Sequence, residues 1–403
     1  MSHADLKSLL ARQRPGWSLE QPFYTSAEVF ELERRGWLAQ QWYLLGHASE
    51  LPSSGNYIVR DLLGESLILA RDEQGLVRGF YNVCRHRGSR ICDGDGRAAQ
   101  LVCPYHSWSY RLDGSLRSAA ALPPGTDTTA LGLHPVPVRE IGGLLIASLT
   151  GQTVTLDLIQ RTFEAGLEYH GVASARIAAR RQYPTHANWK LVIENFIECY
   201  HCLPAHPEYC SVMKHVDAVA REAPEAAAAW NRAVDAWFQS TADSHSPLGS
   251  GRFSFETETI AAVRSPIGGG RQTQSQDGRP VAPLMGALER FDGGVSTFRC
   301  EPFIYTAVLN DHALMFQFLP RAVELTDVTV TWLVDASAAD SQVDLERMLW
   351  LWDTTTRQDK VLIERNAAGV RSRAYTPGPY ATLERWPARL AERYRREMAA
   401  LLG

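Results

Sequence analysis

Four residues in the first third of the chain have the types and spacing of metal ligands. Cys84 and His86 form a Cys-x-His pair, and Cys103 and His106 form a Cys-x-x-His pair farther along. Each short motif therefore supplies one thiolate and one imidazole. Two cysteines and two histidines bind the type of two-iron two-sulfur cluster in which histidines replace cysteines on one iron, which raises its reduction potential. The pattern predicts a site that stores an electron.

A structural zinc ion is the alternative for these four residues, because zinc is also bound by two cysteines and two histidines. Zinc sites more often pair like residues within each short motif, as in C-x₂₋₄-C and H-x₃₋₅-H. Here each motif is mixed. Mixed motifs favour a Rieske cluster, whose two irons have unlike ligand pairs.

A second group of candidate ligands lies farther along the chain. His201 and His206 form a His-x₄-His pair, and the carboxylates of Glu194 and Glu198 precede it. Two histidines and one carboxylate form the facial triad that binds mononuclear non-haem Fe(II) and leaves positions open for oxygen. The run NWKLVIENFIECYHCLPAH predicts one helix, on which Glu198 and His201 would share a face. This pattern predicts an oxygen-activating iron site.

The triad needs a carboxylate from a distant part of the chain. Asp359 is the best candidate, since a helix expected from about Gln342 to Asn366 places it among apolar residues. A buried carboxylate without a partner would be costly there. Asp353 and Glu364 lie on the same expected helix, and the pattern alone leaves both open.

The chain around these motifs divides into three segments that differ in predicted secondary structure. Residues 1–42 predict helices, with Ser26 as a helix N-cap. Residues 43–152 hold short apolar runs split by Gly, Asp and Ser turns, which predict a small β-domain with both cluster motifs at strand ends. Residues 153–403 mix helices with strand-like runs between Gly294 and Ala336. The expected fold class is α+β: a small all-β domain ahead of a larger domain with an antiparallel sheet.

The segment 210–290 and the remaining cysteines follow no regular pattern in the sequence. Residues 210–290 are interpreted as a segment that lines or covers the substrate site, with a flexible surface insertion as the alternative. An odd total of seven cysteines is a poor disulfide framework. Buried thiols or pocket lining are therefore expected for the five cysteines outside the cluster motifs, which are Cys92, Cys199, Cys202, Cys210 and Cys300.

Composition limits the partners and the location. A chain of 403 residues is long enough for two or three domains. A net charge of −4 leaves no basic surplus to neutralise phosphates, which argues against nucleic acid. The N-terminus lacks the apolar core of a signal peptide, and no apolar run is long enough for a membrane span. A cytoplasmic location without a membrane partner is expected.

The two motifs together resemble a known family. NVCRHRG and VCPYH, followed by ENFIECYHC and RQD, resemble the oxygenase α-subunits of Rieske non-haem iron oxygenases over about residues 20–380. The later motifs are most similar to the branch acting on quaternary ammonium compounds, which includes glycine betaine and stachydrine demethylases, choline monooxygenase and carnitine oxygenase. One departure is Ser107, where a glycine commonly follows the last cluster histidine.

The resemblance implies Asp359 as the third ligand of a mononuclear Fe(II). It also implies that Glu198 is an acidic bridge, which we expect to link His201 to His106 of a neighbouring subunit. The implied assembly is a homotrimer with a helix-grip catalytic domain, served by a separate ferredoxin-type, NADH-dependent flavin reductase. The implied reaction uses O₂ to hydroxylate an N-methyl carbon and ends in loss of formaldehyde.

Three other functions stay open from the sequence. The first is an aromatic-ring hydroxylating dioxygenase on the same scaffold. The second is an electron-transfer Rieske protein without oxygenase activity, and the third is a zinc-stabilised binding module.

The substrate class predicts an aromatic cage. A quaternary ammonium group accepts no hydrogen bonds and is recognised by aromatic faces through cation–π attraction. Most aromatic residues fill cores, so only some of the candidates are expected to line the cage. The candidates are Tyr200, Tyr209, Trp230, Trp237, Phe238, Phe298, Phe303 and Tyr305.

Overall fold

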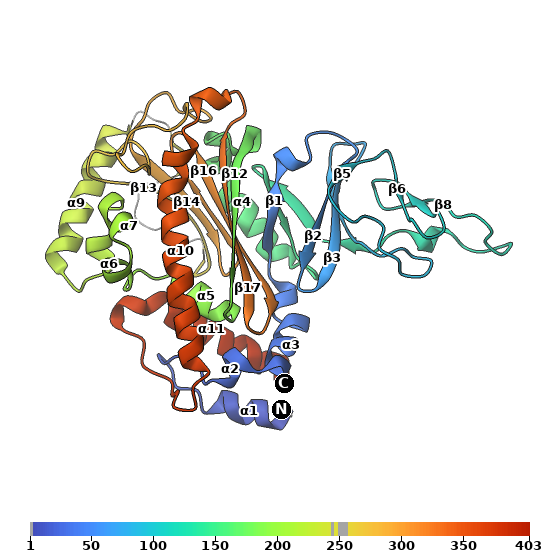
Figure 1. The fold of residues 1–403 in the computed structure, drawn as a ribbon, viewed down its shortest axis with the longest axis horizontal. Helices are drawn as coiled ribbons and strands as arrows, with labels where there is room; N and C mark the ends of the chain where they lie inside the picture. Colours follow the sequence, from blue (N-terminus) through green and yellow to red (C-terminus); the bar gives the residue numbers. More distant parts are fainter. Residues whose placement is uncertain (1–2, 243–245, 249–256) are drawn as a thin grey trace.

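The chain forms a small β-rich unit and a larger unit built on one antiparallel sheet (Figure 1). The computed structural model describes residues 3–242, 246–248 and 257–403. The α+β class expected from the sequence is confirmed. None of the helices in the described ranges combines the length and the apolar character that a bilayer crossing requires.

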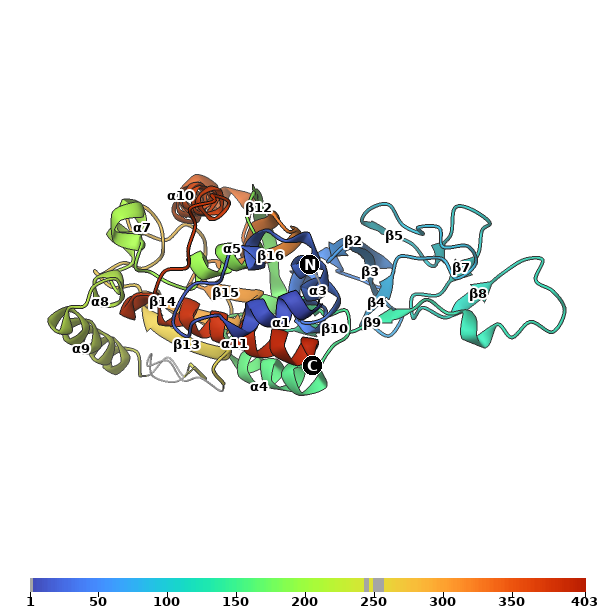
Figure 2. The same ribbon diagram turned by 90° about the horizontal axis from the view of Figure 1, so that it is seen from below.

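Three short helices open the chain and pack beside its C-terminus (Figure 2). They are α1 (His3–Ala11), α2 (Pro22–Thr25) and α3 (Ala27–Arg35). Ser26 caps α3 by accepting a hydrogen bond from the Val29 N–H, as predicted. The helix ends at Arg35 rather than near residue 42, because Gly36 terminates it and a strand soon follows.

The β-rich unit contains three small sheets. A five-stranded sheet has the order β5-β2-β3-β4-β9, and two three-stranded sheets have the orders β1-β11-β10 and β6-β7-β8. The strands are β1 (Tyr43–His47), β2 (Asn56–Leu62), β3 (Glu65–Arg71), β4 (Val77–Tyr81), β5 (Gly96–Arg97), β6 (Leu101–Val102), β7 (Ser109–Tyr110), β8 (Leu116–Ser118), β9 (Pro135–Val136), β10 (Val138–Ile141) and β11 (Leu144–Ala147).

The larger unit is built on a six-stranded antiparallel sheet with the order β12-β17-β16-β15-β14-β13. Its strands are β12 (Ala175–Thr185), β13 (Ile260–Pro266), β14 (Gly294–Cys300), β15 (Ile304–Val308), β16 (Ala313–Ala322) and β17 (Leu325–Asp335). The first part of the strand-like region, from Gly294 to Asn310, forms two strands, because the turn at Glu301–Phe303 reverses the chain between β14 and β15.

Helices cover both faces of this sheet. On one face α4 (Thr153–Tyr169) packs against β13 and β14, and on the other face lie α5 (Trp189–Phe196), α10 (Leu345–Val370) and α11 (Arg385–Leu402). The central strand β16 is therefore apolar and buried through most of its length. Four further helices lie between α5 and β13 along the chain, and of these α7 packs against α10, whereas α9 lies at the outer edge of the unit (Figure 1): α6 (Cys202–Ala205), α7 (Pro207–Val212), α8 (Val216–Val219) and α9 (Pro224–Ser240).

Candidate metal centres and substrate cavity

Two histidines and one aspartate meet beside α10. One donor atom each of His201, His206 and Asp359 lies within 4.8 Å of the other two. The two Nε2 atoms are 3.1 Å apart, and His206 Nε2 lies 3.0 Å from Asp359 Oδ1. Two imidazole nitrogens and one carboxylate oxygen that converge in this way match the facial triad of non-haem iron.

The histidines do not come from one helix, so this prediction was wrong. Helix α5 ends at Phe196, His201 lies in the turn that follows, and His206 lies between α6 and α7. Pro204 and Pro207 help explain the break, because proline lacks the N–H that a continuing helix needs. Tertiary packing, not a shared helix face, brings the two imidazoles together.

A polar side chain contacts the Nδ1 atom of each imidazole and orients the ring. The Nδ1–H of His206 donates to Gln358 Oε1 over 2.8 Å, and Gln358 in turn donates to Glu208. His201 Nδ1 contacts a carboxylate oxygen of Glu198. Such partners fix the tautomer that leaves Nε2 free to bind a metal. Gln358 was missed from the sequence, although it directly precedes Asp359 in the RQD motif.

The site is built to hold positive charge. Burial opposes ionisation of Asp359, but the hydrogen bonds from His201 and His206 outweigh it and lower its pKa. Burial also opposes protonation of His201, yet hydrogen bonds to Asp359 and Glu198 raise its pKa to about 9. A cation that replaces this proton meets two nitrogens and a carboxylate, the donor set that suits Fe(II).

The alternative carboxylates on α10 are engaged elsewhere. Asp353 accepts hydrogen bonds from the Tyr183 hydroxyl and the Arg357 guanidinium. Glu364 accepts one from the His186 backbone N–H and contacts the Lys360 ammonium. The structure thus brings Asp359, and neither of these two, to the histidine pair.

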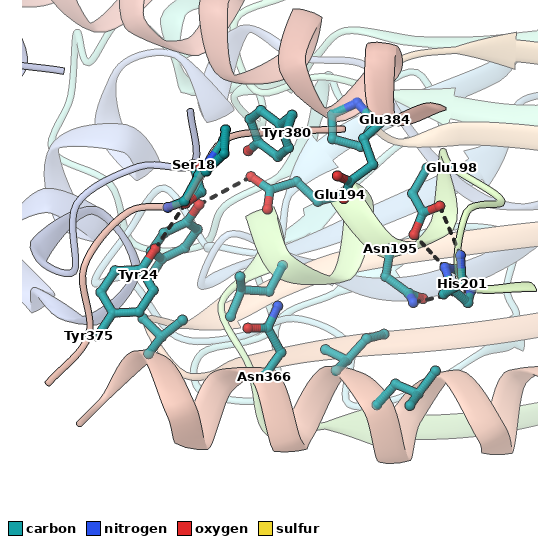
Figure 3. Close-up of a pocket in the computed structure, with 17 residues that line it drawn as sticks. Ser18, Tyr24, Glu194, Asn195, Glu198, His201, Asn366, Tyr375, Tyr380 and Glu384 are labelled. Atoms are coloured by element: carbon teal, nitrogen blue, oxygen red, sulfur yellow. Dashed lines mark hydrogen bonds and ion pairs between the residues drawn. The ribbon is translucent and has the colours of Figure 1, made fainter. Parts of the chain in front are cut away.

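Glu198 lies just outside the triad. It follows the end of α5, so the predicted shared helix face is wrong, but its carboxylate still contacts His201 Nδ1 and the backbone N–H of Tyr200. Figure 3 shows Glu198 turned toward His201, while Glu194 turns away toward Tyr24. Glu198 therefore orients His201 within its own chain.

These carboxylates line a cavity of about 400 Å³, whose other walls include Tyr24, Tyr380 and Glu384 (Figure 3). The Tyr24 hydroxyl donates to Glu194 over 3.4 Å. Burial raises the pKa of Glu194 to about 7 despite the nearby Lys190 ammonium.

The four predicted cluster residues lie on two loops of the β-rich unit. Cys84 and Cys103 are buried, whereas His86 and His106 are exposed with their ring centres 4.6 Å apart. Inner thiols and outer imidazoles are the arrangement that a cluster with one Cys-bound and one His-bound iron requires. The Tyr110 hydroxyl, missed from the sequence, lies 3.2 Å from Cys84 Sγ and can donate to it, since it already accepts from the Arg85 N–H.

The two loops repeat the same turn. The N–H of Gly88 donates to the Cys84 carbonyl over 3.0 Å, and the N–H of Ser107 donates to the Cys103 carbonyl over 3.1 Å. Gly88 and Ser107, each the fourth residue after its cysteine, have left-handed backbone conformations, with φ of 78° and 59°. Glycine suits that conformation best, which explains why Ser107 stands out.

Beside the histidine pair lies a second cavity of about 280 Å³, walled by aromatic rings. Of the candidate cage residues, Tyr209, Trp230, Phe298 and Tyr305 line it. Four do not: Tyr200 is exposed, Phe303 stacks on Tyr43 in the core, and Trp237 and Phe238 lie on α9 outside the lining. Three rings were missed because their strands and helix meet only in the fold, namely Phe196, Phe316 and Trp352.

The predicted segment 210–290 contributes to this cavity through Met213, His215, Val219, Trp230, Val263 and other residues. Part of the segment lies outside the described residues. The same three missed rings also border a small cavity next to Asp359, so the aromatic cavity adjoins the triad.

One cysteine prediction was wrong. Cys199 and Cys202 form a disulfide that closes the turn carrying His201, whereas both were expected as thiols. The turn after α5 brings their backbones to 4.9 Å between Cα atoms, a spacing that a disulfide spans. Cys84, Cys92, Cys103, Cys210 and Cys300 are free.

Comparison with known proteins identifies a matching family for each of the two units. Residues 41–137 match the Rieske [2Fe-2S] domain, and residues 172–400 match the ring hydroxylating alpha subunit (catalytic domain). The chain is 38% identical over 382 residues to the glycine betaine monooxygenase oxygenase subunit of Chromohalobacter salexigens, covering 94% of this chain and 85% of that one. It is 33% identical to the subunit of that name from Pseudomonas aeruginosa, covering 93% and 87%.

Solved structures share the fold at lower identity. The quaternary ammonium Rieske monooxygenase CntA in complex with L-carnitine superposes with a TM-score of 0.68 at 23% identity, covering 96% of this chain and 97% of that one. Naphthalene 1,2-dioxygenase from Rhodococcus sp. gives the same TM-score at 19% identity, covering 99% and 98%. The fold alone therefore does not separate N-methyl from arene substrates.

Proposed function

Since this chain belongs to the Rieske oxygenase α-subunits with a ring-hydroxylating-type catalytic domain, we propose that it is a monooxygenase that hydroxylates an N-methyl carbon of a small quaternary ammonium compound. The observation that carries this proposal is the aromatic cavity beside the triad. Its lining, among the described residues, contains no carboxylate, so a cation there is recognised by ring faces. The glycine betaine relatives support the same substrate class.

His201, His206 and Asp359 are proposed to hold the mononuclear iron, which when bound activates O₂. Gln358 and Glu198 keep the imidazoles in the ligating tautomer. Cys84, His86, Cys103 and His106 are proposed to hold the Rieske cluster, which stores the electrons that this chemistry consumes.

The net reaction balances with two electrons and two protons. One oxygen atom of O₂ enters a C–H bond of the N-methyl group, and the other leaves as water. The hydroxymethyl ammonium product then loses formaldehyde and leaves the amine with one methyl group fewer. The protein positions the methyl group, because Tyr209 and Trp352 flank the cavity near His206 and Asp359.

Two partners are proposed with this activity. A separate ferredoxin-type, NADH-dependent flavin reductase supplies the electrons, a proposal supported by the relatives' description as an oxygenase subunit. A homotrimer is supported by complementary surfaces: the exposed loop of His86 carries Arg87 and Arg90, and the cavity near Glu198 is lined by carboxylates. Residues 1–42, 43–152 and 153–403 are proposed as the helical segment, the cluster domain and the catalytic domain.

Turnover with a substrate panel tests the proposal. The purified protein, loaded with iron and supplied with a Rieske-oxygenase reductase and NADH, is given glycine betaine, carnitine, choline or naphthalene. Formaldehyde release matched to NADH and O₂ consumption is expected with a quaternary ammonium compound. A cis-diol from naphthalene without formaldehyde would assign the chain to the ring dioxygenases instead.

A metal count distinguishes the remaining classes. About three irons and two sulfides per chain are expected, together with the visible absorption of a Rieske cluster. Stoichiometric zinc in a colourless protein would identify a binding module, and a cluster with no iron at the triad would identify an electron-transfer protein.

A further inference from the structure

One end of the aromatic cavity carries a charge. Arg299, on β14, is the one permanently charged side chain of the cavity lining among the residues that the structure describes. His215 also lines the cavity, but burial lowers its pKa to about 4, so it is neutral. The cavity thus combines neutral aromatic walls with a single cationic group.

The Arg299 guanidinium is held in place by its neighbours. Its central carbon lies 4.6 Å from the centre of the Trp386 ring, and one of its nitrogens lies 3.5 Å from a Glu301 carboxylate oxygen. Arg385 and Arg389 approach the same indole at 5.1 and 5.0 Å. Of these three arginines, Arg299 is the one that lines the cavity, so its guanidinium is the one presented to a ligand there.

Glu301 is an ion-pair partner of this guanidinium. Burial raises the pKa of the Glu301 carboxyl and lowers the pKa of the Arg299 guanidinium. Arginine nevertheless keeps its proton in proteins. In a cavity with apolar walls the field of such a charge is screened far less than in water.

The arginine and the triad lie at different ends of a row of rings. Trp352, near Asp359, is followed by Phe316 at 4.8 Å, then Phe196 at 5.2 Å and Tyr305 at 4.9 Å. Tyr305 pairs with Arg299 across β14 and β15. A ligand along this row therefore meets ring faces first and a guanidinium at its far end.

We propose that Arg299 determines substrate specificity by attracting the carboxylate of a zwitterionic betaine whose ammonium group lies against the rings. This proposal rests on the proposed function and adds the substrate's second charge to it. A betaine gains at both ends of the cavity, through cation–π contacts and through a charge-assisted hydrogen bond. A simple cation such as choline gains only the first and is repelled by the arginine.

The test compares each zwitterionic betaine with its methyl ester, which keeps the ammonium charge but lacks the carboxylate. The KM values of γ-butyrobetaine, glycine betaine and their methyl esters, which carry no carboxylate, are measured with the wild-type holoenzyme and with Arg299→Gln. The wild type should prefer each acid over its ester, on the order of tenfold to a hundredfold, and Arg299→Gln should abolish that preference with little change in kcat.

Arg385→Gln is the matched control, because Arg385 contacts the same Trp386 ring but does not line the cavity. It should retain the acid preference. Arg299→Lys, which keeps the charge but not the forked donor, should retain part of it. Unchanged cluster absorption and thermal stability show that each variant is folded, and equilibrium binding of the acids to the reduced, anaerobic protein supplies a readout without turnover.

The outcomes separate the two proposals. If the wild type demethylates betaines and Arg299→Gln keeps the same acid-to-ester ratio, the role of Arg299 is refuted while the function stands. If the wild type acts on no quaternary ammonium compound, the proposed function itself fails. A wild type that prefers choline to every betaine would also refute the role of Arg299.

Discussion

At the scale of single residues, the three carboxylates of α10 differ in the partners that they contact. Asp353 and Glu364 are satisfied by Tyr183, Arg357, His186 and Lys360, whereas the partners of Asp359 within the described part of the chain are the two histidines. A buried carboxylate is costly without a partner, so Asp359 needs either protonated imidazoles or a metal. This difference gives a matched pair of variants.

Asp359→Asn should lose the mononuclear iron and all turnover, because a neutral amide is a poor ligand for Fe(II). Cluster absorption should persist, since the cluster loops lie in the other unit. Asp353→Asn on the same helix should keep its iron. Iron per chain and formaldehyde release measure both variants, and iron retained in Asp359→Asn would remove Asp359 from the ligand set.

Glu194 should make stability depend on pH. Its pKa is raised by burial to about 7 from an ordinary 4.5, so between these values the folded chain holds more protons than the unfolded chain. The free energy of unfolding should therefore fall as pH rises through this window, by at most about 1.4 kcal/mol per pH unit. Lys190 and Tyr24 favour the ionised carboxylate, whereas Glu384 disfavours it.

Urea unfolding across this window checks the prediction. Glu194→Gln should flatten the slope. Tyr24→Phe, which removes a hydrogen bond that lowers the pKa of Glu194, should move the loss of stability to higher pH. An unchanged slope in Glu194→Gln would show that this carboxyl is ionised in the folded protein at every pH tested.

At the scale of elements, the turn between α5 and α6 carries the chemistry. It holds Glu198 and His201, and the Cys199–Cys202 disulfide closes it. The backbone N–H of Tyr200 and the backbone N–H of His201 both point toward the Glu198 carboxylate. The turn thus places a ligand and the group that orients it within four residues of each other.

Thiol counting tests the disulfide. The denatured, metal-free protein should react with a thiol reagent at five cysteines without reductant and at seven with it. Cys199→Ser should give six in both cases, because it frees Cys202, and it should loosen iron binding by releasing the turn. Cys210→Ser, a nearby free thiol, serves as control and should leave the disulfide intact. Seven thiols without reductant would mean that the turn is held by packing alone.

At the scale of the whole molecule, the two predicted metal sites lie far apart. The cluster loops extend at one end of the molecule, and the triad lies beside α10 in the other unit (Figure 1). Electrons are transferred efficiently only over short distances, so the proposed cluster would not reach the proposed iron within one chain. The proposed trimer would place a neighbour's His106 near Glu198.

Glu198→Gln tests this arrangement. Both metals should stay bound, since Glu198 is not a ligand, but reoxidation of the reduced cluster by O₂ and substrate should slow. Reduction of the cluster by the reductase should be unaffected. The native mass should be that of three chains, and Arg87→Glu should weaken the assembly. A monomer, or a wild-type reoxidation rate in Glu198→Gln, would argue against transfer between subunits.

The sequence by itself determined the ligand types and the division of the chain. Short-range spacing places Cys84 beside His86 and Cys103 beside His106 in any fold, because neighbours along the chain stay neighbours. Alternation and turn residues identified the β-rich region and the helix that carries Asp359. These are local properties of the backbone, so they were readable before the chain was folded.

Only the tertiary structure decided between residues that local pattern treats alike. Asp353, Asp359 and Glu364 share one helix, and their partners on β12 and in the α5–α7 region select one of them. Phe196, Phe316 and Trp352 form one wall although a helix, a strand and a second helix supply them. Such choices depend on packing between distant segments, because the energy of burying side chains exceeds the small preference of each residue for a helix or a strand.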